Sequence, residues 1–192
     1  MNTKDRILDV TLDILRKEGF EKITVRRIAE QAEVNVASVS YYFGSKENLI
    51  SNALEVILKD ARKAFEFLYD ESLGPRERLK RFLVHYAAVG LANPEALRRL
   101  LFKGTFDFDS QKDYLQFLRN FGIEKVKQTI GEMSGIKDED TLLLITFQMF
   151  SAMLFPCIMH PVIREMLGYD LKMEDKIDTY FELMLDRYAD NQ

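Results

Sequence analysis

The stretch from Val36 to Tyr42 carries apolar, hydroxyl-bearing and aromatic side chains and no charge. If it is helical, Val39 and Phe43 turn inward together with Val34. The outward face then holds Val36, Ala37, Ser38, Ser40, Tyr41 and Tyr42. Small and hydroxyl-bearing groups can approach base edges and thymine methyl groups in a DNA major groove. This face therefore predicts contact with double-stranded DNA.

Residues that could support catalysis or metal binding are few. The chain has two histidines, His85 and His160, and a single cysteine, Cys157. Cys157 and His160 could share a helix face, but no second close pair completes a tetrahedral metal site, so we expect them to pack at a helix end. There is no phosphate-binding glycine loop and no Gly-x-Ser-x-Gly elbow. We expect no enzyme activity, no metal and no cofactor.

Two short helices must position the uncharged face. Ile28, Ala29 and Ala32 give the segment 24–32 an apolar side at helical spacing. Asn35 is placed to cap the next helix, expected over 36–43, because its side chain can accept a backbone N–H. Two such helices joined by a tight turn have the outline of a helix-turn-helix.

Residues at fixed spacing along the first 50 positions match the pattern of one family. They are Ile7-Leu8, Leu12 to Leu15, Gly19-Phe20, Thr24-Val25, Ile28-Ala29, Val34, Ser40-Tyr41-Tyr42-Phe43 and Ser45-Lys46-Glu47-Asn48-Leu49. On these residues, segment 6–50 resembles the N-terminal DNA-binding domain of the TetR/AcrR family of bacterial transcriptional regulators. The resemblance covers about a quarter of the chain.

The resemblance implies roles for the exposed residues of this segment. The base edges would be faced by Val36, Ala37, Ser38 and Ser40, and the phosphates held by Thr24, Tyr41, Tyr42 and Lys46. Alternatively, one of the two tyrosine rings packs between the short helices and the helix that begins at Lys46. Glu33 stands where the family usually has glycine, and Ser40 where it usually has an aromatic residue. The operator preference of relatives therefore does not transfer.

Charge is balanced in the proposed DNA-binding segment. Residues 1–50 hold eight basic and eight acidic side chains, so the net charge of −4 lies in 51–192. Net charge alone argues mildly against a nucleic-acid partner. However, Lys22, Arg26, Arg27 and Lys46 fall close to the proposed DNA face, and Thr24 opens a helix whose N–H groups can bind a phosphate. We expect few neutralised phosphates and a modest salt dependence of binding.

Beyond Lys46 the pattern predicts helices throughout. We expect them at 46–69, 75–91, from 94 onward, and at 111–133, 139–159 and 173–188. Pro156 and Pro161 should bend or end the 139–159 helix. No alternating pattern typical of strands occurs. The predicted fold class is all-α, with a three-helix helix-turn-helix domain over 1–47 and a larger helical domain over 48–192.

The resemblance implies that the larger domain binds a small effector and forms a homodimer. Apolar residues occupy nearly all sides of 141–159, and a helix of that kind must be covered on several faces. It would form a four-helix dimer interface with the apolar side of the last helix, namely Ile177, Tyr180, Phe181, Met184, Leu185 and Tyr188. Alternatively, both helices fill a monomeric core.

Effector-pocket candidates lie on the helices that enclose the pocket in the family. They are His85, Tyr86, Phe102, Phe106, Phe117, Phe121, Met149 and Met153. The alternative is that they are ordinary core residues. An apolar or amphipathic effector is favoured over a strongly acidic one, because few basic residues sit within the apolar runs.

The predicted function is that of a ligand-responsive transcriptional regulator, most simply a repressor that binds a palindromic operator as a dimer and is released by its effector. The alternative is a DNA-bound interaction protein that recruits a protein partner without sensing a small molecule. No uninterrupted apolar run approaches the roughly 20 residues that span a bilayer, so no membrane association is expected. The charged N-terminus and the single cysteine favour a reducing cytoplasm.

Overall fold

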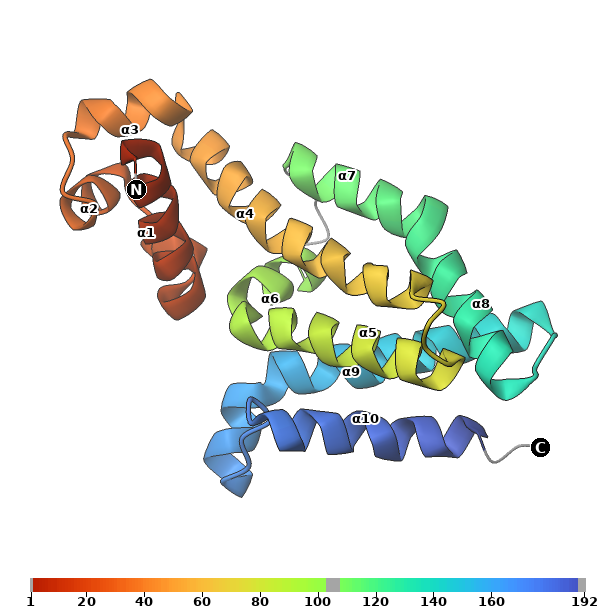
Figure 1. Ribbon diagram of the computed structural model, residues 1–192. Coiled ribbons are helices and arrows are strands. Elements are labelled where there is room, and N and C mark those ends of the chain that lie inside the picture. Colours follow the sequence, from red (N-terminus) through yellow and green to blue (C-terminus); the bar gives the residue numbers. More distant parts are fainter. Residues whose placement is uncertain (1, 103–107, 190–192) are drawn as a thin grey trace. The chain divides into compact units, whose positions relative to one another are not determined.

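The computed structural model describes residues 2–102 and 108–189, and within these ranges it contains helices and no strands (Figure 1). The N-terminal elements are α1 (Thr3–Glu18), η1 (Phe20–Lys22), α2 (Val25–Gln31), α3 (Val36–Phe43) and α4 (Lys46–Lys63). They are followed by η2 (Ala64–Tyr69), α5 (Pro75–Ala92), α6 (Pro94–Phe102), α7 (Asp109–Phe117), η3 (Leu118–Gly122), α8 (Ile123–Ser134), α9 (Glu139–Leu167) and α10 (Glu174–Ala189). The predicted all-α class is confirmed.

The first compact unit combines Met1–Lys59 with Ala92–Tyr114. Its core holds fully buried aliphatic side chains from several elements: Ile7, Leu15, Ile23, Ile28 and Leu49. Helices α1, α2 and α3 pack against one another (Figure 1), and α6 packs against α1. Arg16 of α1 donates from Nε to the side-chain oxygen of the buried Asn93 at 3.0 Å, just before α6 begins. The segment after α5 thus belongs with the helix-turn-helix, while the predicted functional division at residue 47 stays a prediction.

The second compact unit combines Asp60–Leu91 with Leu115–Gln192. Phe82 and Phe181 are fully buried in its core. Arg78 is also buried, and it donates to the carbonyl of Leu68 at 3.2 Å and pairs with Glu132 of α8. This arginine therefore ties η2, α5 and α8 together.

Two helices expected to be continuous change their winding. The helix expected over 46–69 is an α-helix only to Lys63, and η2 continues it as a 3₁₀ helix. The helix expected over 111–133 is interrupted by η3, a π-type turn. At Gly122, at the end of η3, an added Cβ would lie 2.9 Å from the Phe65 ring. Such close packing requires glycine, and residue spacing along the chain does not reveal it.

Helix α9 continues through both of its prolines, contrary to the expectation that it ends near Met159. It runs to Leu167 and closes at Gly168 in the left-handed conformation. Because Pro156 has no N–H, the carbonyl four residues earlier, on Ala152, loses its helical partner. The Tyr180 hydroxyl of α10 donates to that carbonyl at 2.7 Å. A side chain from the neighbouring helix therefore supplies the hydrogen bond that the proline removes.

Helix α9 is the most apolar long helix in the described part of the chain. Its most apolar 18-residue window has a mean hydropathy of 2.0, which by length and composition alone would suffice to cross a membrane. Core helices of soluble proteins pass the same test, and 39% of this window is buried inside the protein.

Candidate nucleic-acid interface

Helix α2 is capped at both ends by local hydrogen bonds. The Thr24 hydroxyl oxygen accepts from the Arg27 N–H at 3.3 Å, as an N-cap does. At the other end, Glu33 N–H donates to the Glu30 carbonyl at 3.2 Å and Val34 N–H donates to the Ala29 carbonyl at 2.9 Å. This pair of bonds is a Schellman motif, which turns the chain sharply at the end of a helix. The turn of the helix-turn-helix is built from it.

Glu33 occupies the position of this motif that needs a left-handed backbone. Its φ is +53°, and no other non-glycine residue in the described part of the chain has a positive φ. Glycine normally takes this place because it has no Cβ to clash there. The sequence pattern singled out Glu33 as a departure, and the structure shows its physical consequence.

Helix α3 is anchored by its cap and by its inner face. The Asn35 side chain accepts from the Ala37 N–H at 2.9 Å, which confirms the predicted cap. Val39 and Phe43 are buried, and Val34 is half-buried. The inner face therefore has the predicted orientation.

The residues predicted to meet DNA lie on the opposite side of α3. Val36, Tyr41 and Tyr42 expose 47%, 82% and 41% of their surface, Ala37 and Ser40 are exposed, and Ser38 is half-buried. The two tyrosine rings contact each other edge to face with centroids 5.1 Å apart. Neither tyrosine is buried. The assignment of base and phosphate contacts stays a prediction.

Of the cations expected near this face, Arg27 is engaged within the protein. Its guanidinium pairs with the Glu18 carboxylate at 3.0 and 2.5 Å. The hydrogen bond with Arg27 holds the pKa of Glu18 below its ordinary value, so the carboxylate stays charged and retains the arginine. Glu18 and Arg27 lie on different helices, and no local spacing predicts their pairing. Lys22 and Arg26 are exposed, and Lys46 is half-buried at the start of α4.

Lys4 is a basic residue whose position the sequence did not predict. Its ammonium lies 5.9 Å from the centre of the Phe43 ring, at the end of α3. Its place beside α3 depends on how α1 packs against the motif, so only the tertiary structure reveals it.

Cys157 and His160 have separate partners within the second unit. The Cys157 thiol donates to the Met153 carbonyl at 3.2 Å, and burial raises its pKa to about 12. His160 Nε2 lies 2.8 Å from an oxygen of Asp170. The thiol is thus kept protonated and unreactive.

The effector-pocket candidates do not form one group. Tyr86 and Phe117 each place a ring against Phe65, at 5.9 and 5.1 Å. Met149 and Met153 are buried, whereas His85 and Phe121 are exposed on the surface. Phe102 and Phe106 lie outside the residues whose side chains the structure describes. The pocket assignment as a whole stays a prediction.

Comparisons with known proteins agree with this geometry. The model of the bacterial regulatory proteins, tetR family, matches residues 7–53. The HTH-type transcriptional repressor KstR of Mycolicibacterium smegmatis is 45% identical over 51 residues, which cover 27% of this chain and 25% of that repressor. The chain spans less than half the length of the curated relatives that it matches.

Solved structures match almost the entire chain. A TetR-like transcriptional regulator from Rhodococcus sp. RHA1 aligns with a TM-score of 0.71 and 19% identity, over 99% of this chain and 97% of that one. FadR from Bacillus subtilis, in complex with stearoyl-CoA, aligns with a TM-score of 0.67 and 16% identity, over 94% and 97%. At these identities the likeness shows a common fold.

Proposed function

We propose that this chain, which belongs to the TetR family of bacterial regulatory proteins, is a transcriptional regulator. It would act as a dimeric repressor that a small apolar or amphipathic effector releases from a palindromic operator. The observation that carries the proposal is the exposed, uncharged face of α3, held outward by the caps of Thr24 and Asn35. The cytoplasm, where its DNA would lie, is the expected location.

Within this interface, side chains divide between base and phosphate contacts. Val36, Ala37, Ser38 and Ser40 would meet base edges, and Thr24, Tyr41, Tyr42 and Lys46 would hold phosphates. Although the Thr24 oxygen caps α2, its hydroxyl hydrogen can still be donated to a phosphate. The phosphate contacts would set the register of the protein on DNA, and the base contacts would read the sequence.

Three substitutions test this division. Lys46→Ala and Tyr42→Phe should weaken binding by a similar factor on every DNA sequence, and Lys46→Ala should lower the salt slope by about one per bound protomer. Ser38→Ala should instead change the preference among sequences by about 2- to 12-fold, the worth of one hydrogen bond. Titration of a panel of labelled duplexes by fluorescence anisotropy measures both effects. A uniform loss from all three variants contradicts the assignment.

Dimerisation is supported by an apolar stripe on the outer side of α9. Leu144, Phe147 and Phe155 lie on one helical face and expose 60%, 53% and 63% of their surface, and Leu183 of α10 exposes 61%. Gln148 and Ser151 are exposed on the same face, between these apolar residues. Large apolar side chains grouped on one exposed face mark an interaction site. A second copy contributing the same stripe would bury it in a four-helix interface, and would place two α3 helices to read two half-sites.

Release by an effector would act through elements that belong with the helix-turn-helix. Helix α4 begins directly after α3, and the Arg16–Asn93 bond joins α1 to the segment preceding α6. A shift of either element would change the separation of the two recognition helices. Coupling of about 1–3 kcal/mol would lower operator affinity about 5- to 150-fold. The stearoyl-CoA bound by Bacillus subtilis FadR is consistent with an acyl or similarly amphipathic effector for this fold.

One observation favours the alternative, a DNA-bound protein that recruits another protein. Met166, Leu167 and Met173, around the turn from α9 to α10, expose 76%, 73% and 54% of their surface. A thermal-shift screen of hydrophobic compounds separates the two functions, because a ligand that binds the native state must raise its melting temperature. An effector-responsive regulator should give compounds that both raise the melting temperature and release operator DNA, whereas the recruiting protein should give none.

A further inference from the structure

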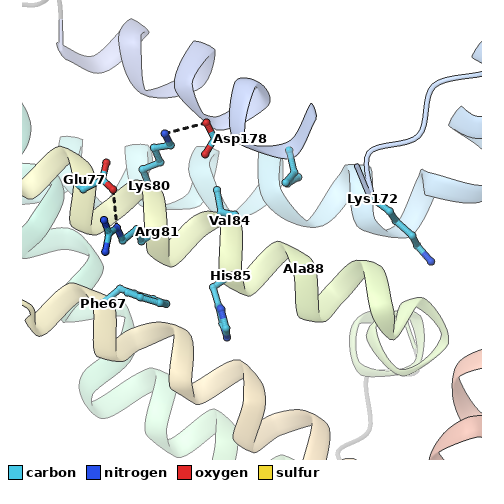
Figure 2. A pocket seen from close by; sticks show the side chains of 10 residues that line it. Phe67, Glu77, Lys80, Arg81, Val84, His85, Ala88, Lys172 and Asp178 are labelled. Atoms are coloured by element: carbon cyan, nitrogen blue, oxygen red, sulfur yellow. Dashed lines mark hydrogen bonds and ion pairs between the residues drawn. The ribbon is translucent and has the colours of Figure 1, made fainter. Parts of the chain in front are cut away.

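A groove of about 450 Å³ lies across α5, between η2 on one side and the start of α10 on the other (Figure 2). Its volume falls in the range of small-molecule sites, about 300–1,000 Å³. Of the effector-pocket candidates whose side chains the structure describes, His85 is the one that lines it. The groove is therefore a different place from the aromatic cluster around Phe65 in the core.

One wall of the groove is aromatic. The rings of Phe67 and His85 lie 5.5 Å apart at an interplanar angle of 59°, and Figure 2 shows both beside α5. Val84, Ala88 and Ile177 add aliphatic surface to the lining. A flat ring can pack against such a wall, because aromatic pairs favour offset and edge-to-face contact over a perfect sandwich.

Most of the charges that line the groove neutralise one another. Lys80 pairs with Asp178 at 3.0 Å, and it also reaches Glu182 at 2.7 Å. Arg81 pairs through Nε with Glu77 at 2.7 Å. Figure 2 shows the Lys80–Asp178 and Glu77–Arg81 pairs as dashed lines. These ion pairs link neighbouring lining residues and leave little net charge around Lys80 and Arg81.

Lys172 is the lining cation left over. Its ammonium has no hydrogen bond or ion pair with the described residues, while its backbone N–H donates to Asp170 at 2.9 Å. That bond fixes the turn before α10 and places Lys172 at the end of the groove remote from Phe67 (Figure 2). The imidazole of His85 lies between Phe67 and Lys172 (Figure 2). It likewise has no hydrogen bond to the described residues, and it can donate a hydrogen bond to an acceptor.

We propose that this groove binds a small aromatic carboxylate, whose ring lies along Phe67, His85 and Ala88 and whose carboxylate faces Lys172. The site goes beyond the proposed function, because it is separate from the internal effector pocket and its occupancy is measured without DNA. An anion is preferred over a cation because Lys172 is the one charged lining residue without an ion pair among the described residues. A flat ring is preferred over a long alkyl chain because one wall of the groove is aromatic.

Calorimetric titration of the full-length protein with 2-naphthoate tests the proposal, with 2-naphthylmethylammonium as the probe of equal shape and opposite charge. The Kd of 2-naphthoate should be at least about fivefold lower than the Kd of 2-naphthylmethylammonium. Lys172→Glu should raise the naphthoate Kd by about fivefold or more. The control Lys137→Glu makes the same change of net charge on an exposed residue outside the groove. Its effect should stay below about twofold, because distant surface charges are screened.

A second pair of variants tests the location independently of charge. Ala88→Trp fills the groove from an exposed position and should abolish naphthoate binding. The control Ala92→Trp adds the same bulk at an exposed alanine of α5 that does not line the groove, and should leave the Kd unchanged. Circular dichroism confirms that each variant is folded. The proposal is wrong if naphthoate fails to bind, if both probes bind equally, or if the groove variants and their controls behave alike.

Discussion

Replacing Glu33 with glycine should stabilise the helix-turn-helix. Glu33 has a φ of +53°, and an L-residue in the left-handed helical conformation costs about 1–2 kcal/mol. Glycine removes that cost but loses about 0.5–1 kcal/mol through the extra freedom of its unfolded chain. The two ranges give a net gain of about 0–1.5 kcal/mol, with a central value of about 0.75 kcal/mol. The Schellman hydrogen bonds of Glu33 and Val34 are made by backbone groups, so they persist in the variant.

The assay is urea unfolding at 25 °C, supported by calorimetry, where a gain of this size raises the melting temperature by about 1–4 °C. Glu33→Ala is the matched control, because it removes the same carboxylate and keeps a Cβ in the left-handed conformation. It should be less stable than Glu33→Gly, because any gain from removing the negative charge at the C-terminal end of α2 is common to both variants. Both variants should bind DNA more tightly at low salt, because both remove a negative charge next to the recognition helix, and the gain should fade as salt screens it.

The two measurements separate backbone strain from charge. If Glu33→Ala stabilises the protein as much as Glu33→Gly does, the positive φ is not the cause and the strain argument fails. If only Glu33→Gly improves DNA binding, the carboxylate is not repelling the phosphates, and the improvement comes from the conformation of the turn.

Three further predictions concern the second unit. Tyr180→Phe leaves the Ala152 carbonyl without its donor and should cost about 1 kcal/mol, read as a melting temperature lower by about 2–4 °C. Phe155→Glu puts a charge into the apolar stripe and should shift the protein from dimer to monomer in sedimentation velocity. Asp170→Asn removes a carboxylate whose pKa is held low, first of all by its hydrogen bond with His160. Because the pKa of Asp170 is lower in the folded protein than in the unfolded chain, where it is about 3.9, the ionised carboxylate stabilises the folded state above that pH. The variant should therefore have a lower melting temperature than the unsubstituted protein at pH 7. The difference between the two melting temperatures should shrink as the pH falls below about 3.9.

Matched variants control the first two of these. Tyr188→Phe removes a hydroxyl that donates to the exposed side chain of Gln148 at 2.8 Å, and should change stability by no more than about 0.5 kcal/mol. Phe121→Glu changes an exposed phenylalanine away from the α9 stripe and should leave the dimer intact. Equal effects from variant and control contradict the corresponding prediction. The prediction for Asp170→Asn is contradicted if the difference in melting temperature between the variant and the unsubstituted protein stays constant from pH 7 to pH 3.

Local signals predicted the recognition motif well. Asn35 is followed by a short helix with two inward apolar residues, and capping and periodicity are properties of neighbouring residues. The family pattern also marked Glu33, although spacing alone says nothing of its φ. The pairing of Arg27 with Glu18 was not predictable, because it joins two helices whose packing is set by the whole unit.

Helix α9 shows where local rules give way to tertiary contacts. Proline chemistry correctly predicts a lost hydrogen bond at Pro156, but the helix continues because Tyr180, distant in sequence, donates to the freed carbonyl. The apolar composition of α9 likewise predicted that several of its faces are buried. It did not show which residues are buried within one chain and which are left for a second copy. The structure buries Met149 and Met153 and leaves Leu144 and Phe155 exposed. That division decides which face is available to a second copy.

Selection of DNA from a random pool by the purified protein, followed by sequencing, tests the central claim most directly. A dimer that reads DNA with the outer face of α3 should enrich a palindrome whose half-site centres lie about one helical turn, or about 34–36 Å, apart. The Ser38→Ala variant should enrich a palindrome of the same spacing with an altered base at a symmetric pair of positions. Recovery of no common motif at moderate salt, or of the same motif from both proteins, would contradict this assignment of the recognition face.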